Sequence, residues 1–391
     1  MITREDIREL AQFQTSGENE CALSFYFQPR TPQNKSHREE AILAKDLVRD
    51  ALRESEKNGK NGHAREDLRK ILNIAGTLRG NQARAKVIFA CSSRKLWREF
   101  DVPPQLPSTG LFVNRRFHLK PLASVLGTQS RLAVVVVDRE KARFFDFNLD
   151  ELREREGMFH ALPRRGRSDG FGGYQGGHSE RSVNDEVLHH FKTVAARLKE
   201  MHERRTFEKL IMGSHEANWH DFEPQLHPYV QQVLLGHFSA EVATISEEQI
   251  RDHVQRILRQ SQEQHRRDAV REVLSQAKSN GRGVTGLRRV LRSLEMGEVQ
   301  ILLLSEDYSA RAVECTACGH LDAHMVRYCP VCGRGTRELE DVCEAIIPLA
   351  FRRDIELVYV KDDPDFDRVG NIAALLRFRA DQNANSNTAP S

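Results

Sequence analysis

The chain has 391 residues, of which 59 are basic and 56 acidic, so its formal net charge at pH 7 is only +3. This length suggests two to four domains with substantial cores, and the charge excludes a global basic field as the means of holding nucleic acid. No uncharged segment approaches the roughly 20 residues that span a bilayer, and the start lacks the apolar segment of a signal peptide. We therefore expect a cytoplasmic protein with no membrane partner.

The first part of the chain, residues 1–128, predicts a mixed α/β domain. Short apolar runs typical of strands are separated here by two segments with the helical period of 3.6 residues. The expected elements are a strand at 22–27, helices at 42–52 and 68–78, a strand at 86–92 and another near 111–119.

Residues 129–280 predict a second α/β domain. Its first strand, Leu132–Val137, is apolar on both faces and is therefore expected at the centre of a sheet. Asp138 follows at the strand end, where we interpret it as a turn residue. The other expected elements are a strand at 142–147, a helix at 184–204, a strand at 207–213, a helix at 218–235 and a strand at 238–244.

A long helix is predicted from Ser246 to Asn280, because neither Pro nor Gly interrupts this stretch. Ser246 and Gln249 have the spacing of a capping box, in which each side chain bonds the backbone N–H of the other residue. Both ends of the helix carry apolar residues, whereas 259–268 has almost none. The pattern favours a strut between two domains with a solvated middle.

Residues 281–379 predict a third domain, and the Asn- and Ser-rich tail 380–391 predicts a disordered segment. The expected elements of this domain are a helix at 285–294, strands at 299–305 and 356–360, and a helix at 370–377.

A glycine-rich segment, Ser168–Arg181, precedes the helix of the second domain. Five glycines in eight residues cannot build a core, but they leave main-chain N–H groups open to water or to an anion. Three arginines stand just before them and can hold phosphates in bidentate contacts. We interpret the segment as a flexible basic loop that faces phosphate-rich material. The residues concerned are Arg164, Arg165, Arg167, Gly170, Gly172, Gly173, Gly176 and Gly177.

Four of the seven cysteines form two C-x-x-C pairs separated by ten residues. Each pair is followed by glycine, and two such turns direct four thiolates toward one tetrahedral zinc ion. Four protein ligands leave no open coordination position, so we predict a structural zinc in a ribbon at 313–335. Cys343 is expected in a buried strand and not as a fifth ligand. The predicted ligands are Cys315, Cys318, Cys329 and Cys332.

The order of these features resembles the archaeo-eukaryotic class 1 release factor and Pelota superfamily, specifically its bacterial members. The resemblance covers about 132–377. Residues 210–214 and 224–226 are similar to a strand and proline turn of the family's middle domain, and 284–304 is similar to its third domain. This resemblance implies an α/β (α+β) multidomain chain with an RNase-H-like middle domain and an L7Ae-like third domain into which the zinc ribbon is inserted.

The resemblance also implies a ribosome partner, because such proteins enter the A site in a tRNA-like pose with the middle-domain loop at the peptidyl-transferase centre. We expect a translation factor of ribosome rescue or hibernation type that binds large-subunit RNA and no DNA. Release factors carry Gly-Gly-Gln in this loop, whereas Tyr174 stands between Gly173 and Gln175 here. The residues expected at the RNA are Arg164, Arg165, Arg167, Gly172, Gly173, Tyr174, Gln175, Gly176, Gly177 and Arg181.

Three roles remain open at this point. A non-enzymatic one is favoured, because Tyr174 shifts Gln175 by one position and catalytic geometry tolerates only about 1 Å. The enzymatic alternative is peptidyl-tRNA hydrolysis, with Gln175 as the catalytic residue that offers a donor to the developing oxyanion. The third is a zinc-ribbon scaffold for protein interactions. We expect a monomer, and a translational GTPase is the partner that the sequence leaves open.

The second domain is also rich in histidine, and Ser214-His215-Glu216 has the residue types of a catalytic triad. Adjacent residues cannot converge as triad members do. We therefore expect Ser214 to cap a helix and the histidines to be solvated. Asp138 and Asp146 are not expected to be nuclease carboxylates, since paired metal sites need several converging acids.

Overall fold

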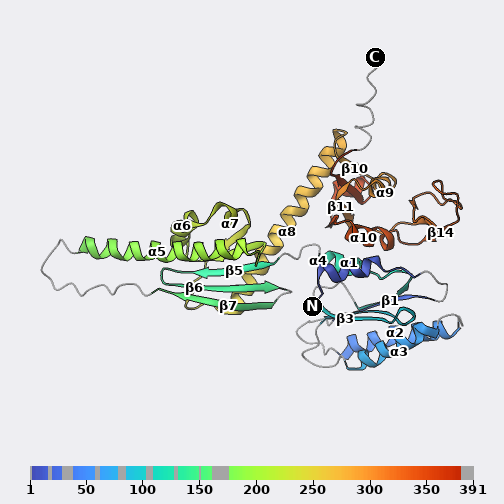
Figure 1. Cartoon of the computed structure of the whole chain (residues 1–391), viewed down its shortest axis with the longest axis horizontal. Coiled ribbons are helices and arrows are strands. Elements are labelled where there is room, and N and C mark those ends of the chain that lie inside the picture. Colours follow the sequence, from blue (N-terminus) through green and yellow to red (C-terminus); the bar gives the residue numbers. More distant parts are fainter. Residues whose placement is uncertain are drawn as a thin grey trace, which may run out of the picture. The chain divides into compact units, whose positions relative to one another are not determined.

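The computed structural model describes residues 2–15, 20–28, 38–57, 62–77, 85–102, 109–126, 131–148, 151–160 and 176–379 (Figure 1). The chain forms two compact units. One combines both ends of the chain, Met1–Thr128 and Arg266–Ser391, and the other is Gln129–His265. The protein is thus a mixed α/β multidomain chain, as expected, while the division into three domains stays a prediction. None of the described helices is long and apolar enough to cross a membrane.

The amino-terminal part of the first unit contains an antiparallel sheet of order β3-β2-β1-β4. β3 has no counterpart among the predicted strands, and the strand expected near 111–119 ends at Asn114, after which the chain turns into α4. The strands are β1 (Ala22–Phe27), β2 (Ala85–Cys91), β3 (Leu96–Val102) and β4 (Gly110–Asn114); the helices are α1 (Arg4–Gln12), α2 (Arg38–Lys57), α3 (Gly62–Thr77), the short η1 (Ser92–Arg94) and α4 (Lys120–Leu126).

Helices α2 and α3 cover one face of this sheet (Figure 1). Because successive strand residues point to opposite faces, Phe25 and Ile88 pack under these helices, whereas Tyr26 and Phe89 point to the other face. That second face belongs to a different core, described below. β1 is buried along its whole length for this reason.

The carboxy-terminal part of the first unit is built on a sheet of order β10-β16-β11-β15, in which only β11 and β15 run parallel. The helix expected at 370–377 is wrong: Ile372–Leu376 is strand β16, fully buried between two neighbouring strands. The elements are β10 (Gly283–Thr285), α9 (Leu287–Met296), β11 (Val299–Ser305), α10 (Cys343–Arg352), β15 (Glu356–Val360), α11 (Pro364–Arg368) and β16.

A small three-stranded sheet of order β13-β12-β14 is inserted between β11 and α10. Its strands are β12 (Ala312–Cys315), β13 (Leu321–Asp322) and β14 (Thr336–Leu339), and it carries the four grouped cysteines. We call residues 312–339 the ribbon. Cys343 is buried, but it begins helix α10 and does not lie in the expected strand.

The two ends of the chain share one hydrophobic core. Ile7 and Phe117 from the amino-terminal part lie in the same cluster of buried side chains as Leu302, Val342 and Ile346 from the carboxy-terminal part. Helix α1 packs against α10 at this joint. Burial of apolar surface is the main favourable term in folding, so the two parts stabilise each other.

A buried ionic cluster crosses the same joint. Glu314 of the ribbon is 3 % exposed, and its carboxylate accepts hydrogen bonds from Arg116 Nη1 at 3.0 Å and Arg337 Nε at 3.1 Å. Burial by itself raises the pKa of Glu314, but the bonds and charges of the two arginines outweigh it and hold the pKa below its usual range. In a separate contact across the joint, Lys120 Nζ donates a hydrogen bond of 2.7 Å to the carbonyl of Tyr308.

The second unit is a five-stranded sheet of order β7-β6-β5-β8-β9. β5 pairs in parallel with β8, and β8 with β9, whereas β6 is antiparallel to both its neighbours. This order, with one reversed strand, is that of an RNase-H-like sheet. The strands are β5 (Leu132–Val137), β6 (Lys141–Asn148), β7 (Glu151–Phe159), β8 (Lys209–Gly213) and β9 (Leu234–Phe238).

Helices cover both faces of this sheet. α5 (Gly176–Glu203), α6 (Glu216–Phe222) and α7 (Pro228–Gln232) lie on one face (Figure 1), and the start of α8 packs on the other. The single helix expected at 218–235 is wrong, because the chain passes through the short η2 (Glu223–Gln225) and restarts at Pro228. The strand predicted at 238–244 lies earlier, as β9, and β7 has no predicted counterpart.

Helix α8 (Glu247–Lys278) confirms the long predicted helix. Its capping box is present: Gln249 N donates to Ser246 Oγ at 3.2 Å and Ser246 N to Gln249 Oε1 at 3.0 Å. No residue between Val254 and Ala269 is buried, so the middle is solvated as expected.

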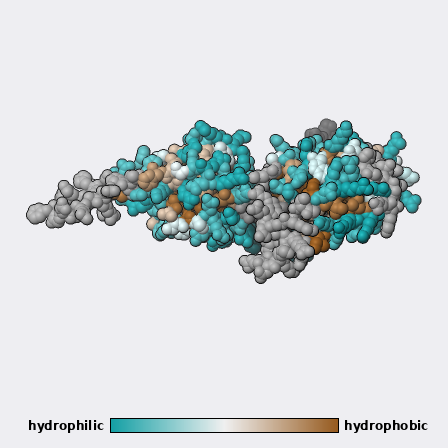
Figure 2. All heavy atoms as spheres, turned by 90° about the horizontal axis from the view of Figure 1, so that it is seen from below, coloured by the Kyte–Doolittle hydropathy of each residue, from teal (hydrophilic) through white to brown (hydrophobic). Residues whose placement is uncertain are grey.

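Figure 2 shows one largely hydrophilic face of the molecule, on which hydrophobic residues, coloured brown, are visible in limited stretches.

Candidate functional site

Most of the predicted RNA-facing loop lies outside the described residues, which leave out 161–175. This holds for Arg164, Arg165, Arg167, Gly172, Gly173, Tyr174 and Gln175. Gly176, Gly177 and Arg181 belong to helix α5, which begins eight residues before the helix expected at 184–204. The ten RNA-facing residues and the catalytic role of Gln175 therefore stay predictions.

The described residues that flank this loop form a well-defined base. The loop leaves β7 at His160, whose N–H donates to the carbonyl of Glu140 at 2.8 Å, and it returns at the start of α5. Arg139 Nη2 donates to Asn184 Oδ1 of α5 at 3.2 Å, which ties the turn between β5 and β6 to the helix. The end of β7 and residue Asn184 of α5 are thus both tied to the turn between β5 and β6.

Two histidines pair at this base. His190 Nδ1 of α5 lies 2.9 Å from His160 Nδ1, and the His190 side chain is completely buried. Burial, and next the neighbouring His160, lower the pKa of His190. At neutral pH one ring must therefore donate and the other accept. The expectation that the histidines are solvated is wrong for His190, whose contacts no sequence pattern reveals.

The Asp138 turn is as predicted. Its Oδ1 accepts from the N–H groups of Glu140 at 2.9 Å and Lys141 at 2.7 Å. Asp146 is ion-paired with Arg155 across strands β6 and β7. Both carboxylates thus have local partners, and neither belongs to a group of possible metal ligands found among the described residues.

Ser214 does not cap a helix. Its Oγ lies 3.0 Å from Nε2 of His237, and the same nitrogen lies 3.1 Å from the Ser214 carbonyl. His237 stacks on Trp219 with ring centroids 4.4 Å apart. Ser214 is completely buried, so the pair ties β8 to β9 and presents no accessible nucleophile. The cap of α6 is His215, whose Nδ1 accepts from Ala217 N.

The four cysteines of the ribbon converge. All four sulfur atoms lie within 4.8 Å of one another, with Cys315 and Cys332 sulfurs 3.3 Å apart and those of Cys318 and Cys329 3.7 Å apart. A metal–sulfur distance of about 2.3 Å in a tetrahedral site gives sulfur separations of this size. The cluster could therefore hold a metal ion, as the spacing indicates.

The chemistry of the donors fits a metal ligand set. The N–H groups of Cys318 and Ala317 point at the Cys315 sulfur and lower the pKa of that thiol to about 6, which favours the thiolate. Burial, by contrast, raises the pKa of Cys343 to about 12. Cys343 therefore stays a thiol and lies outside the group, as expected.

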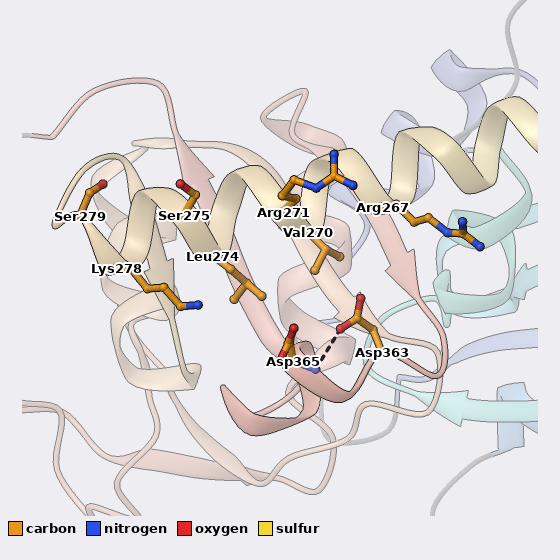
Figure 3. Close-up of a pocket in the computed structure, with 9 residues that line it drawn as sticks. All are labelled: Arg267, Val270, Arg271, Leu274, Ser275, Lys278, Ser279, Asp363 and Asp365. Atoms are coloured by element: carbon orange, nitrogen blue, oxygen red, sulfur yellow. Dashed lines mark hydrogen bonds between the residues drawn. The ribbon is translucent and has the colours of Figure 1, made fainter.

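A groove of about 650 Å³ lies between the carboxy-terminal half of α8 and α11 (Figure 3). Val270 and Leu274 form an apolar part of its wall, with Lys278 along the helix and Asp363 opposite. Asp363 caps α11 by accepting from two N–H groups, so its charge is used locally. The groove carries both signs of charge and indicates no particular ligand.

Residues 118–259 match the family described as "Bacterial archaeo-eukaryotic release factor family 10". The match contains all five strands of the second unit and the glycine-rich segment. This stretch, about a third of the chain, is similar to the bacterial branch of the archaeo-eukaryotic release factors. This confirms the resemblance drawn from the order of its motifs.

Similarity to two curated proteins extends over more of the chain. It is 24 % identical over 298 residues to "Peptide chain release factor subunit 1-1" of Methanosarcina acetivorans, covering 67 % of this chain and 69 % of that protein. It is 23 % identical over 320 residues to "Peptide chain release factor subunit 1" of Thermococcus onnurineus, covering 74 % and 75 %.

Among solved structures, Archaeoglobus fulgidus Pelota superposes with a TM-score of 0.36 at 12 % identity, covering 96 % of this chain and 93 % of that one. Dom34 of S. cerevisiae gives a TM-score of 0.41 at 10 % identity, covering 96 % and 91 %. The similarity to the release-factor family depends on the sequence match and on the strand order of the second unit.

Proposed function

We propose that this protein is a ribosome-binding translation factor that occupies the A site, with the 161–175 loop toward large-subunit RNA. The observation that carries the proposal is the family match over the whole sheet from which this loop projects. Release-factor relatives of similar length support it. A role in rescue or hibernation, in the cytoplasm, as a monomer and without DNA, is part of the same proposal, and a translational GTPase is a candidate partner.

The physical support is the cationic character of the loop on an anchored base. Arg164, Arg165 and Arg167 add three charges within four residues, and no acidic residue stands between Phe159 and Ser168. Contacts of arginine with phosphate release counterions, so such binding weakens steeply with salt.

Ribosome pelleting at 50–200 mM salt tests the proposal. We expect the protein to sediment with 70S particles at low salt, and expect R164A/R165A/R167A to lose most of this binding. The control is R131A/R153A/R204A, which removes the same charge from exposed, ion-paired arginines of the same unit. Equal loss in both triple variants, or no sedimentation of the natural chain at low salt, would refute the assignment.

Peptide release separates occupancy from hydrolysis. With Tyr174 inserted beside Gln175, we expect no release of peptide from ribosomes that carry peptidyl-tRNA. Release that the Gln175→Ala variant abolishes, with 70S binding unchanged, would instead establish the hydrolytic alternative.

We also propose that the ribbon cysteines bind a structural zinc ion. The support is a set of four thiols without other ligand types, at tetrahedral separations and with no open coordination position. Mass spectrometry of the metal in purified protein should give one zinc per chain. Cys318→Ser should lower both metal content and thermal stability, whereas Cys21→Ser, outside the group, should leave the metal content at one.

A further inference from the structure

The second cysteine turn of the ribbon, residues 327–335, directs apolar side chains into solvent. Tyr328 is 72 % exposed and Val331 66 %, and nearby Met325 is 44 % exposed. The other exposed large hydrophobic side chains of the described residues are spread singly or in pairs over the fold. Three exposed apolar side chains between residues 325 and 331 favour an interaction surface at this turn. We call Met325, Tyr328 and Val331, with the arginines described below, the ribbon tip.

The backbone beneath these side chains is fixed. Cys329 N donates to the carbonyl of Arg334 at 2.7 Å, Gly333 N to that of Cys329 at 2.9 Å, and Tyr328 forms a bridge with Gly335. Val331 N points at the Cys329 sulfur at 3.4 Å. Because the turn is already ordered, a ligand that binds there does not have to restrict its backbone.

Two arginines flank Tyr328. Arg327 and Arg334 are both exposed, and neither has an ion-pair partner among the described residues. Their neighbours differ: Arg337 binds the buried Glu314, and Arg311 pairs with Glu338. The sequence from Ala323 to Arg337 contains no acidic residue. The tip therefore combines a bare aromatic ring with two uncompensated guanidinium groups.

We propose that the ribbon tip binds single-stranded RNA, with Tyr328 stacking on an unpaired base and Arg327 and Arg334 contacting the flanking phosphates. Every base has a face that stacks on an aromatic ring, and arginine supplies the phosphate contacts. A stable protein interface buries more than 1,000 Å² in total, which three small apolar contacts do not supply. That this RNA is ribosomal depends on the function proposed above; the binding chemistry does not.

The test uses the full chain with R164A/R165A/R167A, so that the glycine-rich loop does not contribute. Binding to a fluorescent 12-nucleotide uridine-rich RNA is followed by anisotropy. Tyr328→Ala should weaken binding about tenfold, the usual loss of one stacked base, whereas Tyr328→Phe should keep it. Tyr229→Ala is the matched control, because Tyr229 is 61 % exposed on the other unit. Arg334→Ala should weaken binding and flatten its salt dependence.

Several outcomes would overturn the proposal. Unchanged binding in Tyr328→Ala, equal losses in Tyr328→Ala and Tyr229→Ala, or equal affinity for a duplex of the same length each contradicts base stacking. Tyr328-dependent binding to isolated ribosomal proteins without RNA binding would make the tip a protein contact. If the RNA result holds but the natural chain never sediments with ribosomes, the proposed function fails and the tip assignment stands.

Discussion

The two units of this chain are built in opposite ways. The second is one continuous segment around one sheet. The first joins residues more than 200 positions apart, such as Asn114 and Glu344, whose side chains bond at 2.7 Å. In the first unit an amino-terminal sheet and a carboxy-terminal sheet are stabilised by one core. We therefore expect the amino-terminal part, most of which lies outside the family match, to depend on the other end of the chain for its stability.

The largest expected effect follows from separating the parts. A fragment of residues 1–128 exposes Ile7 and Phe117, which are buried against the carboxy-terminal part in the whole chain. We expect no cooperative urea unfolding of this fragment, whereas 129–265 should unfold in one transition. A sharp transition of 1–128 alone, followed by circular dichroism, would show that the shared core is dispensable.

Arg116→Ala sharpens the comparison at the joint. It leaves the buried carboxylate of Glu314 with Arg337 as its remaining charge partner. Breaking a buried ion pair costs about 3–5 kcal/mol, and we expect a loss near the lower end, measured as the free energy of unfolding of the first unit. Arg311→Ala, whose ion pair with Glu338 is exposed, should change it by less than about 1 kcal/mol. Similar losses of unfolding free energy in both variants would mean that the buried ion pair stabilises the protein no more than the exposed one.

Acid should act on the first unit through His118. Burial lowers its pKa to about 4 from the ordinary 6.5, and its ring stacks on Phe112 with centroids 3.8 Å apart. Between these two pH values the imidazole is protonated in the unfolded chain and neutral in the folded one. The free energy of unfolding is therefore highest above pH 6.5 and falls as the pH drops toward 4. The loss is about 3 kcal/mol. His118→Phe should reduce this pH dependence in urea titrations, and an unchanged slope would contradict the assignment.

The smallest effect is expected in the second unit, at a contact between residues three positions apart. Ser246→Ala removes the side chain that accepts from Gln249 N at the start of α8. Loss of such a cap costs about 1 kcal/mol. Ser261→Ala, in the interior of the same helix, should cause no loss, because Ala is the better helix former. A larger loss of stability in Ser261→Ala than in Ser246→Ala would show that the cap does not account for the effect.

Strong local signals predicted part of the molecule correctly. The apolar run of β5, the capping box at Ser246 and the cysteine spacing can each be read within a short stretch of sequence. The turn at Asp138 is of the same kind. The Tyr328 surface could also have been anticipated, since Tyr328 stands immediately before the second cysteine pair and Val331 lies within it.

Other elements were beyond the reach of local patterns. Ile372–Leu376 consists of Ile, Ala and Leu, of which Ala and Leu are strong helix formers, yet two neighbouring strands hold it as β16. β7 has many charged residues and lacks the apolar pattern that predicts a strand. At the sheet edge it is stabilised by ion pairs such as Arg143–Glu154. The His160–His190 and Ser214–His237 contacts join separate elements and have no sequence signature.

The sequence by itself determined the central strand, the long helix, the two cysteine turns and the family relationship, because each depends on residues within a short span or on their order. Only the tertiary structure decided that both ends of the chain share a core and that Glu314 is buried between two arginines. It also decided that Arg327 and Arg334 have no ion-pair partner within the part of the chain that the structure describes. Burial and ion pairing depend on which distant segments meet, and a linear pattern does not contain that information.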